Sequence, residues 1–440
     1  MKVLKFGGSS VGTAERMKGL VPLIHNEEPK IVVLSAMQGT TNHLIEISTA
    51  LYENNNEKAN QLIKKLENVY YDVIKQLYKT NSSLYRAQEL IESHFTYLRS
   101  FTIDMFTNSE EKAILAQGEL LSTALFHYYL EEEKIDSVLL PALNFMRIDE
   151  NETPDMKYIE QNCKEEFAKY PNSKLFITQG YICRNSFGEI DNLKRGGSDY
   201  SATIIGAAIH AEEIEIWTDI DGMHNNDPRI VENTKSIAEL SFDEAAELAY
   251  FGAKILHPTC ILPAKMNNIP VRLLNTMDPG AIGTRISSNK TEDSIKAVAA
   301  KDGITAINIK SARMLMAYGF LRAVFEIFER YKTPIDMITT SEVAVSLTVD
   351  NIDYLDSIVS ELKEFCSVGL DSGLTIICIV GNFSAEKQGC ALKIFEALKN
   401  IPIRMISYGG SENNVSVLVD SKLKKEALIA LNKGLFNFSN

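Results

Sequence analysis

Long apolar runs and paired cysteines are both missing from this sequence of 440 residues. No stretch reaches the roughly 18–20 apolar residues of a transmembrane helix, so we expect no membrane span. The six cysteines include no Cys-x-x-Cys pair, which gives no sign of a zinc site or a disulfide framework. We expect buried free thiols in a reducing compartment. The glycine-rich N-terminus does not resemble a signal peptide, and a cytoplasmic protein is therefore expected.

Positive charge is also in short supply. The 45 Lys and Arg residues face 58 Asp and Glu residues, which gives a formal net charge of -13. A general nucleic-acid binder carries a basic surface, so that class is excluded. A phosphate site is still allowed, because a few local cations and backbone N–H groups suffice for one nucleotide. The length allows two to four domains of about 100–200 residues each.

Two common nucleotide-binding motifs are absent. The chain has no G-x-x-x-x-G-K-[ST] run, and its first glycine-rich loop lacks G-x-G-x-x-G, which disfavours a P-loop fold and a dinucleotide site. The N-terminus instead places Lys5 at the end of an apolar run, before Gly7, Gly8, Ser9 and a helical pattern over residues 14–25. Bare glycines at a helix N-terminus admit a phosphate. A tight strand-to-helix turn with a surface lysine is the alternative.

Short apolar runs alternate with helical patterns in the first part of the chain. Those at residues 31–34, 175–178 and 213–217 read as buried parallel strands, which predicts an α/β domain with ligands at the carboxyl ends of the strands. Residues 44–130 change to helical periodicity, which indicates a helical insertion. A polar, glycine-containing boundary follows at residues 277–293.

Beyond that boundary, one pattern occurs twice. A strand, a helix and a strand are predicted over residues 304–349, and again over residues 374–419. The repeat predicts a pair of small α+β modules.

A second glycine-rich turn, residues 195–199 (Arg-Gly-Gly-Ser-Asp), opens a predicted helix over residues 200–210. Arginine can hold a carboxylate or phosphate with two parallel hydrogen bonds. The alternative is a capped helix, with Ser198 or Asp199 as the N-cap. Two glycine loops, each with its own cation, favour a cleft that handles phosphate. Glu119 precedes an apolar helix over residues 120–130, where a glutamate ordinarily interacts with the helix dipole.

These motifs together resemble the aspartokinases, a group within the amino acid kinase family. The matching blocks follow one another at residues 5–11, 35–36, 41–42, 118–119, 196–199, 218–219, 227–229 and 251–254. Residues 319–321 and 338–342 resemble the regulatory ACT modules of these enzymes. The resemblance covers essentially the whole chain.

The resemblance implies a domain organisation. Residues 1–285 would form a three-layer α/β/α amino acid kinase domain with a mainly parallel sheet, in which residues 44–130 are a largely helical lobe. Residues 295–440 would form two α+β, ferredoxin-like ACT modules that interleave and pair between subunits as a homodimer. No segment remains for a homoserine dehydrogenase domain, so a monofunctional enzyme is expected.

The resemblance also implies an activity, the ATP-dependent phosphorylation of the L-aspartate side-chain carboxylate to 4-phospho-L-aspartate. This is the first step towards lysine, threonine and methionine. By likeness, Lys5 is the catalytic cation with Asp199 alongside, and Gly7, Gly8 and Ser9 line the phosphate loop. The substrate contacts would come from Ser35, Thr41, Glu119 and Arg195, and further nucleotide contacts from Thr218, Asp219, Arg229, Lys254 and Ile255. Mg²⁺ would be held mainly by nucleotide phosphates and water.

Feedback by lysine is implied by an effector pattern in the ACT region. The residues that match the lysine-sensitive type are Met314, Gly319, Phe320, Leu321, Asp336, Thr340 and Ser341. The chain departs from that pattern at Ala317, where a serine is usual, and at Pro334, where a small polar residue is usual. His224 stands where many relatives have a tyrosine beside the adenine. These departures leave lysine inhibition and the adenine contact open.

Two other functions remain as alternatives. One is another amino acid kinase of the same fold, such as a glutamate kinase. The paired ACT modules and the Lys-Phe-Gly-Gly-Ser-Ser-Val opening argue against it. The other is a non-catalytic amino-acid sensor that has kept the fold, against which Lys5, Glu119 and Arg195 argue.

Overall fold

The computed structural model describes residues 1–103, 106–193, 196–252, 256–289, 295–311, 318–384 and 388–436. The chain divides into two compact units. The first comprises Met1–Met223, Ala238–Phe242 and Leu256–Asn289, and the second comprises His224–Ile237, Asp243–Ile255 and Lys290–Asn440. The expected division into a catalytic domain over residues 1–285 and a regulatory region over residues 295–440 stays a prediction.

The first unit is built on a sheet of eight strands in the order β3-β4-β2-β1-β7-β9-β10-β8. The strands are β1 (Lys2–Phe6), β2 (Lys30–Leu34), β3 (Val138–Leu140), β4 (Leu175–Gln179), β7 (Ile214–Thr218), β8 (Glu239–Ser241), β9 (Val271–Asn275) and β10 (Thr284–Ser287). Pairing is parallel from β3 through β9, and only the β9–β10 pair is antiparallel. The predicted mainly parallel sheet is therefore confirmed.

The first unit also contains eight α-helices among its described residues. They are α1 (Ala14–Ile24), α2 (Thr40–Tyr52), α3 (Asn56–Leu77), α4 (Asn81–Ser100), α5 (Asn108–Glu132), α6 (Met156–Ala168), α7 (Gly197–Ala208) and α9 (Leu262–Met266). Strands β5 (Ile182–Arg184) and β6 (Ile190–Asn192) form a separate two-stranded antiparallel hairpin. Successive side chains of a strand point to opposite faces. Leu4 and Phe6 of β1 enter an apolar core shared with α1, α3 and α5, so Lys5 lies on the other face, where α7 packs.

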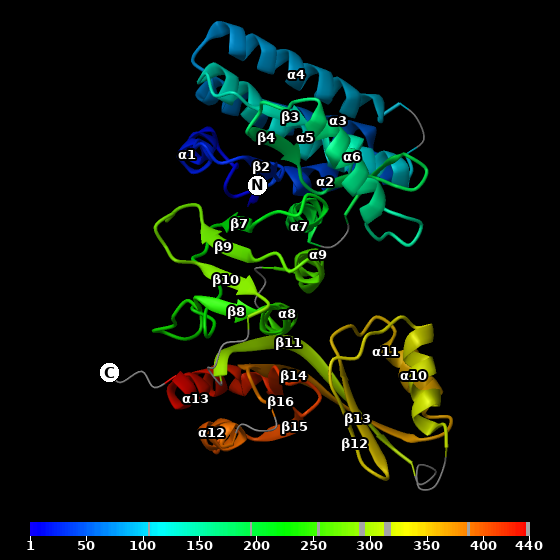
Figure 1. Ribbon diagram of the computed structural model, residues 1–440. Coiled ribbons are helices and arrows are strands. Elements are labelled where there is room, and N and C mark those ends of the chain that lie inside the picture. Colours follow the sequence, from blue (N-terminus) through cyan, green and yellow to red (C-terminus); the bar gives the residue numbers. More distant parts are fainter. Residues whose placement is uncertain are drawn as a thin grey trace. The chain divides into compact units, whose positions relative to one another are not determined.

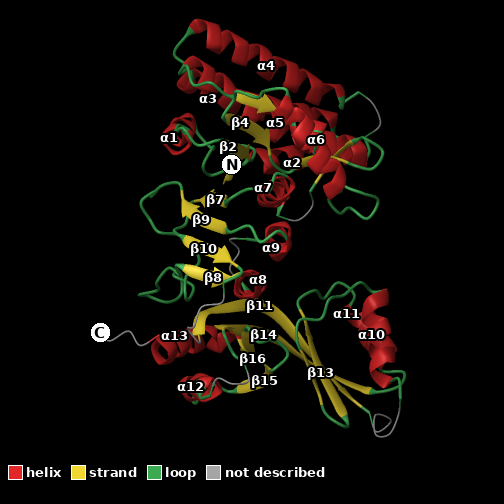
Figure 2. Ribbon diagram, in the orientation of Figure 1, coloured by secondary structure: helices red, strands yellow, loops and turns green. Residues whose placement is uncertain are grey.

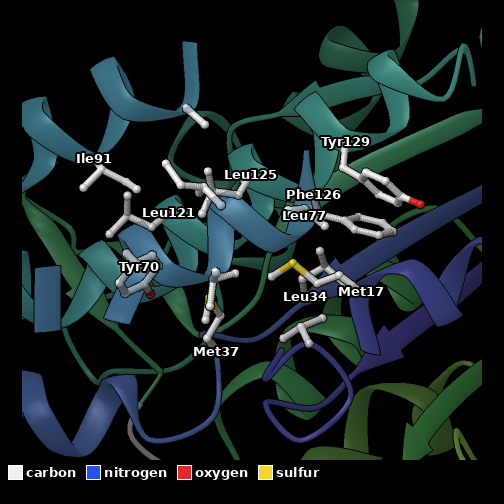
Figure 3. Packing of buried hydrophobic residues seen from close by; sticks show 14 of the residues in the cluster. Met17, Leu34, Met37, Tyr70, Leu77, Ile91, Leu121, Leu125, Phe126 and Tyr129 are labelled. Atoms are coloured by element: carbon white, nitrogen blue, oxygen red, sulfur yellow. The ribbon is translucent and has the colours of Figure 1, made fainter. Parts of the chain in front are cut away.

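The predicted helical insertion consists of α2–α5, which Figure 1 shows side by side. Helix α3 buries Ile63, Leu66, Tyr70, Ile74 and Leu77 at three- and four-residue steps, the spacing of one helix face. Helix α5 is buried nearly all round from Ala113 onwards. Figure 3 shows Leu121, Leu125 and Phe126 of this helix among the core side chains. The helical lobe is thus a continuous part of the core of the first unit.

The second unit contains a six-stranded antiparallel sheet in the order β12-β13-β11-β14-β16-β15 (Figure 2). Its strands are β11 (Ile295–Lys310), β12 (Ile338–Thr340), β13 (Ala344–Val349), β14 (Ser367–Gly381), β15 (Ile403–Tyr408) and β16 (Asn414–Asp420). Its helices are α8 (Phe242–Phe251), α10 (Phe320–Arg330), α11 (Leu355–Leu362), α12 (Cys390–Ala397) and α13 (Lys424–Phe436). The first residue of α8, Phe242, is assigned to the first unit.

This sheet carries two separate apolar cores. One core packs α10 and α11 around Ile307 and Leu347, and the other packs α12 and α13 around Ile377 and Val417. The long strand β11 contributes to both, through Ile307 and Val298. The predicted pair of α+β modules is confirmed, and the two modules share their central strands.

The cysteines and the long helices of the described residues can be examined directly. All six cysteines are free thiols, and five of them are buried while Cys366 is half-buried. Among the described helices, none combines the length and the apolarity that a membrane crossing requires.

Candidate active site

Lys5 and Asp199 meet at the carboxyl end of β1. Lys5 is the fourth residue of β1, and Asp199 lies in the first turn of α7. The Nζ atom of Lys5 is 2.6 Å from Oδ1 of Asp199, and the two side chains are 11% and 17% exposed. This contact is an ion pair only, because Oδ1 makes no hydrogen bond of acceptable geometry within the described residues. The structure therefore brings together the two residues predicted as catalytic.

The loop after β1 presents unused backbone donors. The N–H of Gly7 bonds to the Trp217 carbonyl, and the N–H groups of Ser10 and Val11 bond to the Gly7 carbonyl. The N–H groups of Gly8 and Ser9 have no partner within the described part of the chain. A Cβ atom on Gly8 would lie 2.9 Å from the Ala36 carbonyl oxygen. A side chain there would separate this loop from the turn after β2.

A cavity of about 430 Å³ opens between this loop, the turn after β2, and the start of α7. It includes three of the predicted substrate contacts, Ser35, Thr41 and Glu119. Two predicted phosphate-loop residues, Gly8 and Ser9, also lie in its wall. The other lining residues are Ala36, Met37, Gln38, Gly39, Asn42, Tyr181, Gly197 and Ser198.

Glu119 is the most unusual group in this cavity. Glu119 is only 4% exposed, and its Oε2 atom has no hydrogen-bond partner among the described residues. Burial raises the pKa of Glu119 from its ordinary value of 4.5 to about 8, although the Ala36 N–H and the charge of Lys5 act in the opposite direction. An unpaired carboxylate in such a place is suited to a cationic ligand group, which would supply the missing interaction.

The expected helical context of Glu119 was wrong. The sequence pattern placed it before a helix over residues 120–130, where it would interact with the helix dipole. In the structure α5 begins at Asn108, so Glu119 lies in the middle of the helix. Thr107 caps the helix in a capping box with Glu110. The true start is twelve residues earlier than predicted, because the polar first turns of α5 carry the capping signal, while the apolar run marks only its most buried part.

The alternative interpretation of the second glycine-rich turn, with Ser198 or Asp199 as the N-cap of α7, was also wrong. Neither Ser198 nor Asp199 caps this helix, because the N-cap is Gly196 in the left-handed region at φ +76°. A Cβ atom on Gly196 would lie 1.7 Å from the sulfur of Cys260. The tight packing selects glycine, which leaves Ser198 to line the cavity and Asp199 to face Lys5.

The predicted nucleotide contacts are spread over both units. Thr218 ends β7, the parallel neighbour of β1, and Asp219 follows it, exposed and bonded to the Thr218 hydroxyl. Arg229 lies in the second unit, where its guanidinium binds both carboxylate oxygens of Asp227. Three of the predicted substrate and nucleotide contacts, Arg195, Lys254 and Ile255, fall outside the described residues.

Tyr181 is a cavity residue that the sequence reasoning missed. Its φ of +64° places it in the left-handed region, which is strained for an aromatic residue. Its N–H bonds to the hydroxyl of Ser201, and its carbonyl accepts the N–H of Leu193. Only the run Gln-Gly-Tyr after a predicted strand signalled a turn here, and nothing in it marks a tyrosine in the cavity wall.

The predicted effector residues lie in the second unit, with Met314 and the departure at Ala317 outside the described residues. Gly319 is the N-cap of α10, Phe320 packs on Phe365, and Leu321 is 40% exposed. Thr340 ends β12, and Ser341 bonds through its N–H to the Ala344 carbonyl. His224, the third departure, has its Nδ1 2.9 Å from the Thr234 hydroxyl.

Asp336 is the one predicted effector residue with a buried charge. Its side chain is fully buried, and its Oδ1 accepts hydrogen bonds from Lys301 Nζ and the Tyr250 hydroxyl, both at 2.7 Å. Lys301 also lies 2.8 Å from Asp350, and over the Tyr250 ring at 4.4 Å. Burial lowers the pKa of Lys301, but the bonds to Asp336 and Asp350 more than offset it, so that the pKa is raised.

Metal ligands do not cluster in the described part of the chain. No group of three or more His, Cys, Asp or Glu side chains there is arranged to hold a metal ion. The polar groups that line the cavity are instead backbone N–H donors, hydroxyls, side-chain amides and a buried carboxyl group, and the Lys5 ammonium lies at the end of β1, before the phosphate loop. These are groups that bind anions and ammonium groups.

Comparison with known proteins places this geometry in a family. The profile of the amino acid kinase family matches residues 1–275, and an ACT domain profile matches residues 377–435. The chain is 34% identical over 451 residues to lysine-sensitive aspartokinase 3 of Escherichia coli strain K12, covering 99% of both chains. It is 33% identical to the chloroplastic aspartokinase 2 of Arabidopsis thaliana, over 99% of this chain and 84% of that one.

Solved structures agree with the sequence matches. The crystal structure of Escherichia coli aspartokinase III in complex with aspartate and ADP superposes with a TM-score of 0.83 at 32% identity. It covers 99% of this chain and 100% of that one. The alignments run over almost the whole chain and include both the kinase-like unit and the ACT region. The chain therefore belongs to the amino acid kinase family and, within it, to the aspartokinases.

Proposed function

We propose that this protein is an aspartate kinase, which transfers the γ-phosphoryl group of ATP to the side-chain carboxylate of L-aspartate. The observation that carries the proposal is the cavity in which a buried, unpaired Glu119 shares the wall with the phosphate loop beside Lys5. A dicarboxylic amino acid has an ammonium group for the former and a reacting carboxylate for the latter. The relative of known structure was solved with aspartate and ADP, which supports the same pair of ligands here.

The amino acid would be held at both ends. Glu119 would bind its ammonium group, since an opposite charge favours the ionised form of a buried carboxyl group. Arg195 would bind its α-carboxylate by a bidentate contact. Ser35 and Thr41 would then lie near the reacting carboxylate. Discrimination against longer substrates would follow from the fixed span between these anchors.

Phosphoryl transfer requires mainly positioning and neutralisation of charge. A carboxylate is already a nucleophile, so no general base is needed. Lys5 and the free N–H groups of Gly8 and Ser9 would stabilise the charge on the transferred group, while Asp199 fixes the position of the Lys5 ammonium. Gly7 shapes the same loop. Thr218, Asp219, Arg229, Lys254 and Ile255 would contact the nucleotide. Mg²⁺ would arrive on the ATP phosphates, because it retains waters and takes few protein ligands.

Regulation would come from the ACT region. We propose L-lysine as the effector, bound by Met314, Gly319, Phe320, Leu321, Asp336, Thr340 and Ser341, with two subunits paired through this region. The T-state structure of the Escherichia coli relative was solved with lysine and aspartate, which supports the choice of effector. The six free cysteines support a reducing, cytoplasmic location.

A hydroxamate assay with aspartate and glutamate as separate substrates tests the activity. We expect ATP-dependent product with aspartate only, and its loss in Lys5→Ala. Phosphorylation of glutamate alone would support the glutamate kinase alternative. An absence of ATP turnover in the parent protein with either amino acid would support the non-catalytic sensor.

A further inference from the structure

Arg16 joins two of the loops that line the cavity. It lies in the first turn of α1, and its backbone N–H bonds to the N-cap hydroxyl of Thr13. From there its Nη1 reaches the Ser9 carbonyl at 2.6 Å and Oε1 of Gln38 at 3.1 Å. Ser9 belongs to the loop after β1 and Gln38 to the turn after β2, and both line the cavity. A single guanidinium nitrogen therefore bridges the two segments.

The bridge fixes the orientation of one peptide group. The peptide between Ser9 and Ser10 is held at both ends, because its N–H bonds to the Gly7 carbonyl at 2.9 Å and its carbonyl accepts from Arg16. A carbonyl oxygen turned into the cavity would repel a phosphate. With this carbonyl held on the α1 side, the loop keeps the free N–H groups of Gly8 and Ser9 as its phosphate-binding donors.

The bridge also sets the spacing of the two loops. They pack without side chains at Gly8, where a Cβ atom would lie 2.9 Å from the Ala36 carbonyl. They pack in the same way at Gly12, where a Cβ atom would lie 2.9 Å from Cβ of Gln38. Two glycine contacts alone allow the loops to slide or separate. The Arg16–Gln38 hydrogen bond adds a directional tie at the edge of this contact.

We propose that Arg16 is a positioning residue for phosphoryl transfer, which acts through Ser9 and Gln38 to preorganise the phosphate loop. This inference rests on the proposed function, because it assumes that the loop receives the phosphates of ATP. Preorganised donors bind a developing charge without reorganisation at the moment of reaction. The three residues are called the Arg16 clasp below.

Four variants test the clasp: Arg16→Ala, Arg16→Lys, Gln38→Ala and the double variant Arg16→Ala/Gln38→Ala. The readouts are KM for ATP, KM for aspartate, kcat, and the affinity for a non-hydrolysable ATP analogue with Mg²⁺. We expect Arg16→Ala to raise KM for ATP about tenfold, since a hydrogen bond from a charged group is lost, with KM for aspartate within about twofold of the parent. For Arg16→Lys we expect a KM for ATP between those of the parent protein and Arg16→Ala, because the lysine ammonium keeps the positive charge but does not bridge Ser9 and Gln38.

Gln38→Ala distinguishes positioning from a direct charge effect. If Arg16 acts through the bridge, Gln38→Ala weakens ATP binding in the same direction, and the double variant is no worse than Arg16→Ala. An unchanged KM for ATP in Gln38→Ala, or losses that add in the double variant, would overturn the bridge. Glu15→Ala, the exposed neighbour on the same helix, is the matched control and should leave all four readouts unchanged.

The analogue affinity separates the two hypotheses. A parent protein that binds the analogue but does not phosphorylate aspartate would overturn the proposed function. The Arg16 clasp would then be tested by the analogue affinity of Arg16→Ala relative to that of the parent protein. Equal affinity in the parent and Arg16→Ala would overturn the clasp, whatever the turnover. A parent protein that binds no nucleotide would overturn both.

Discussion

The Nζ atom of Lys5 lies 2.6 Å from Oδ1 of Asp199, although the two residues come from a strand and a helix far apart in the sequence. Both side chains are largely buried. The pair holds an ammonium group at the end of β1, beside the loop with free N–H donors. Positioned in this way, Lys5 can neutralise charge on a phosphoryl group without a conformational search.

We expect Lys5→Met to lower kcat by at least about 10²-fold, the usual effect of removing one donor to a developing negative charge. Asp199→Asn should lower kcat as well and reduce the free energy of unfolding by about 1–3 kcal/mol, because a buried ammonium loses its partner. Steady-state kinetics and urea denaturation measure both effects. The double variant separates them, since it should regain stability and remain inactive. Full activity in Asp199→Asn would contradict the positioning role of this carboxylate.

Glu119 predicts a pH dependence of stability. Its pKa is raised to about 8 by burial, so the folded protein holds a proton that the unfolded chain releases above its ordinary pKa of about 4.5. The free energy of unfolding therefore falls as the pH rises from 4.5 to 8, by on the order of 1.4 kcal/mol for each pH unit in this range. Glutamine does not titrate, so the free energy of unfolding of Glu119→Gln should not fall in this way. The variant should become more stable relative to the parent protein as the pH rises over that range.

Chemical denaturation at pH 5, 6.5 and 8 measures the difference for Glu119. Glu15→Gln, an exposed position on α1, serves as the control. A stability difference between the parent protein and Glu119→Gln that does not change with pH would show that Glu119 is not protonated in the folded state.

Two helical glycines should respond in opposite directions to alanine. A Cβ atom on Gly118 in α5 would lie 2.7 Å from Cβ of Ala36, whereas one on Gly19 in α1 would meet nothing within 4 Å. Gly118→Ala should destabilise the protein by about 1–3 kcal/mol through overpacking and lower kcat by shifting Glu119. Gly19→Ala should stabilise it by up to about 1 kcal/mol through helix propensity. Thermal melts and kinetics of both variants test this, and a stabilised, fully active Gly118→Ala would contradict it.

The buried Lys301–Asp336 pair should be essential for the stability of the second unit. Removing one partner of a buried ion pair costs about 3–5 kcal/mol, so we expect this loss for Lys301→Met. Tyr250→Phe removes one hydrogen bond to the same carboxylate and should cost about 1 kcal/mol. Equal, small effects of the two substitutions on denaturation midpoints would mean that the charge of Lys301 contributes little.

L-Lysine should stabilise the protein if the proposed effector site is complete. A ligand at 100 times its Kd adds about 2.7 kcal/mol to the free energy of unfolding. We expect a rise in Tm at millimolar lysine, together with inhibition of the kinase, and neither effect with threonine. Inhibition by threonine instead would reassign the effector. No response to lysine would show that the departures at Ala317 and Pro334 have removed the site.

Local patterns predicted much of the fold. Apolar runs of four or five residues between turn residues marked β1, β2, β4 and β7 correctly, since strands buried on both faces leave that signal. The spacing of Leu66, Tyr70 and Ile74 predicted the helical lobe. The start of α5 was missed because its first turns are polar and resemble a loop in the sequence. The apolar pattern that indicated a helix begins only where the helix becomes buried.

The sequence by itself determined the strands, the glycine loops, the acidic surface charge and the resemblance to a family, because each depends on neighbours along the chain. Tertiary structure decided which charges meet. The pairing of Lys5 with Asp199, the hydrogen bonds of Arg16 to Ser9 and Gln38, and the burial of Asp336 against Lys301 all join residues from separate elements. The raised pKa of Glu119 was likewise decided by the tertiary structure, because it results from burial. Such interactions depend on distance and desolvation in three dimensions, which no spacing along the chain records.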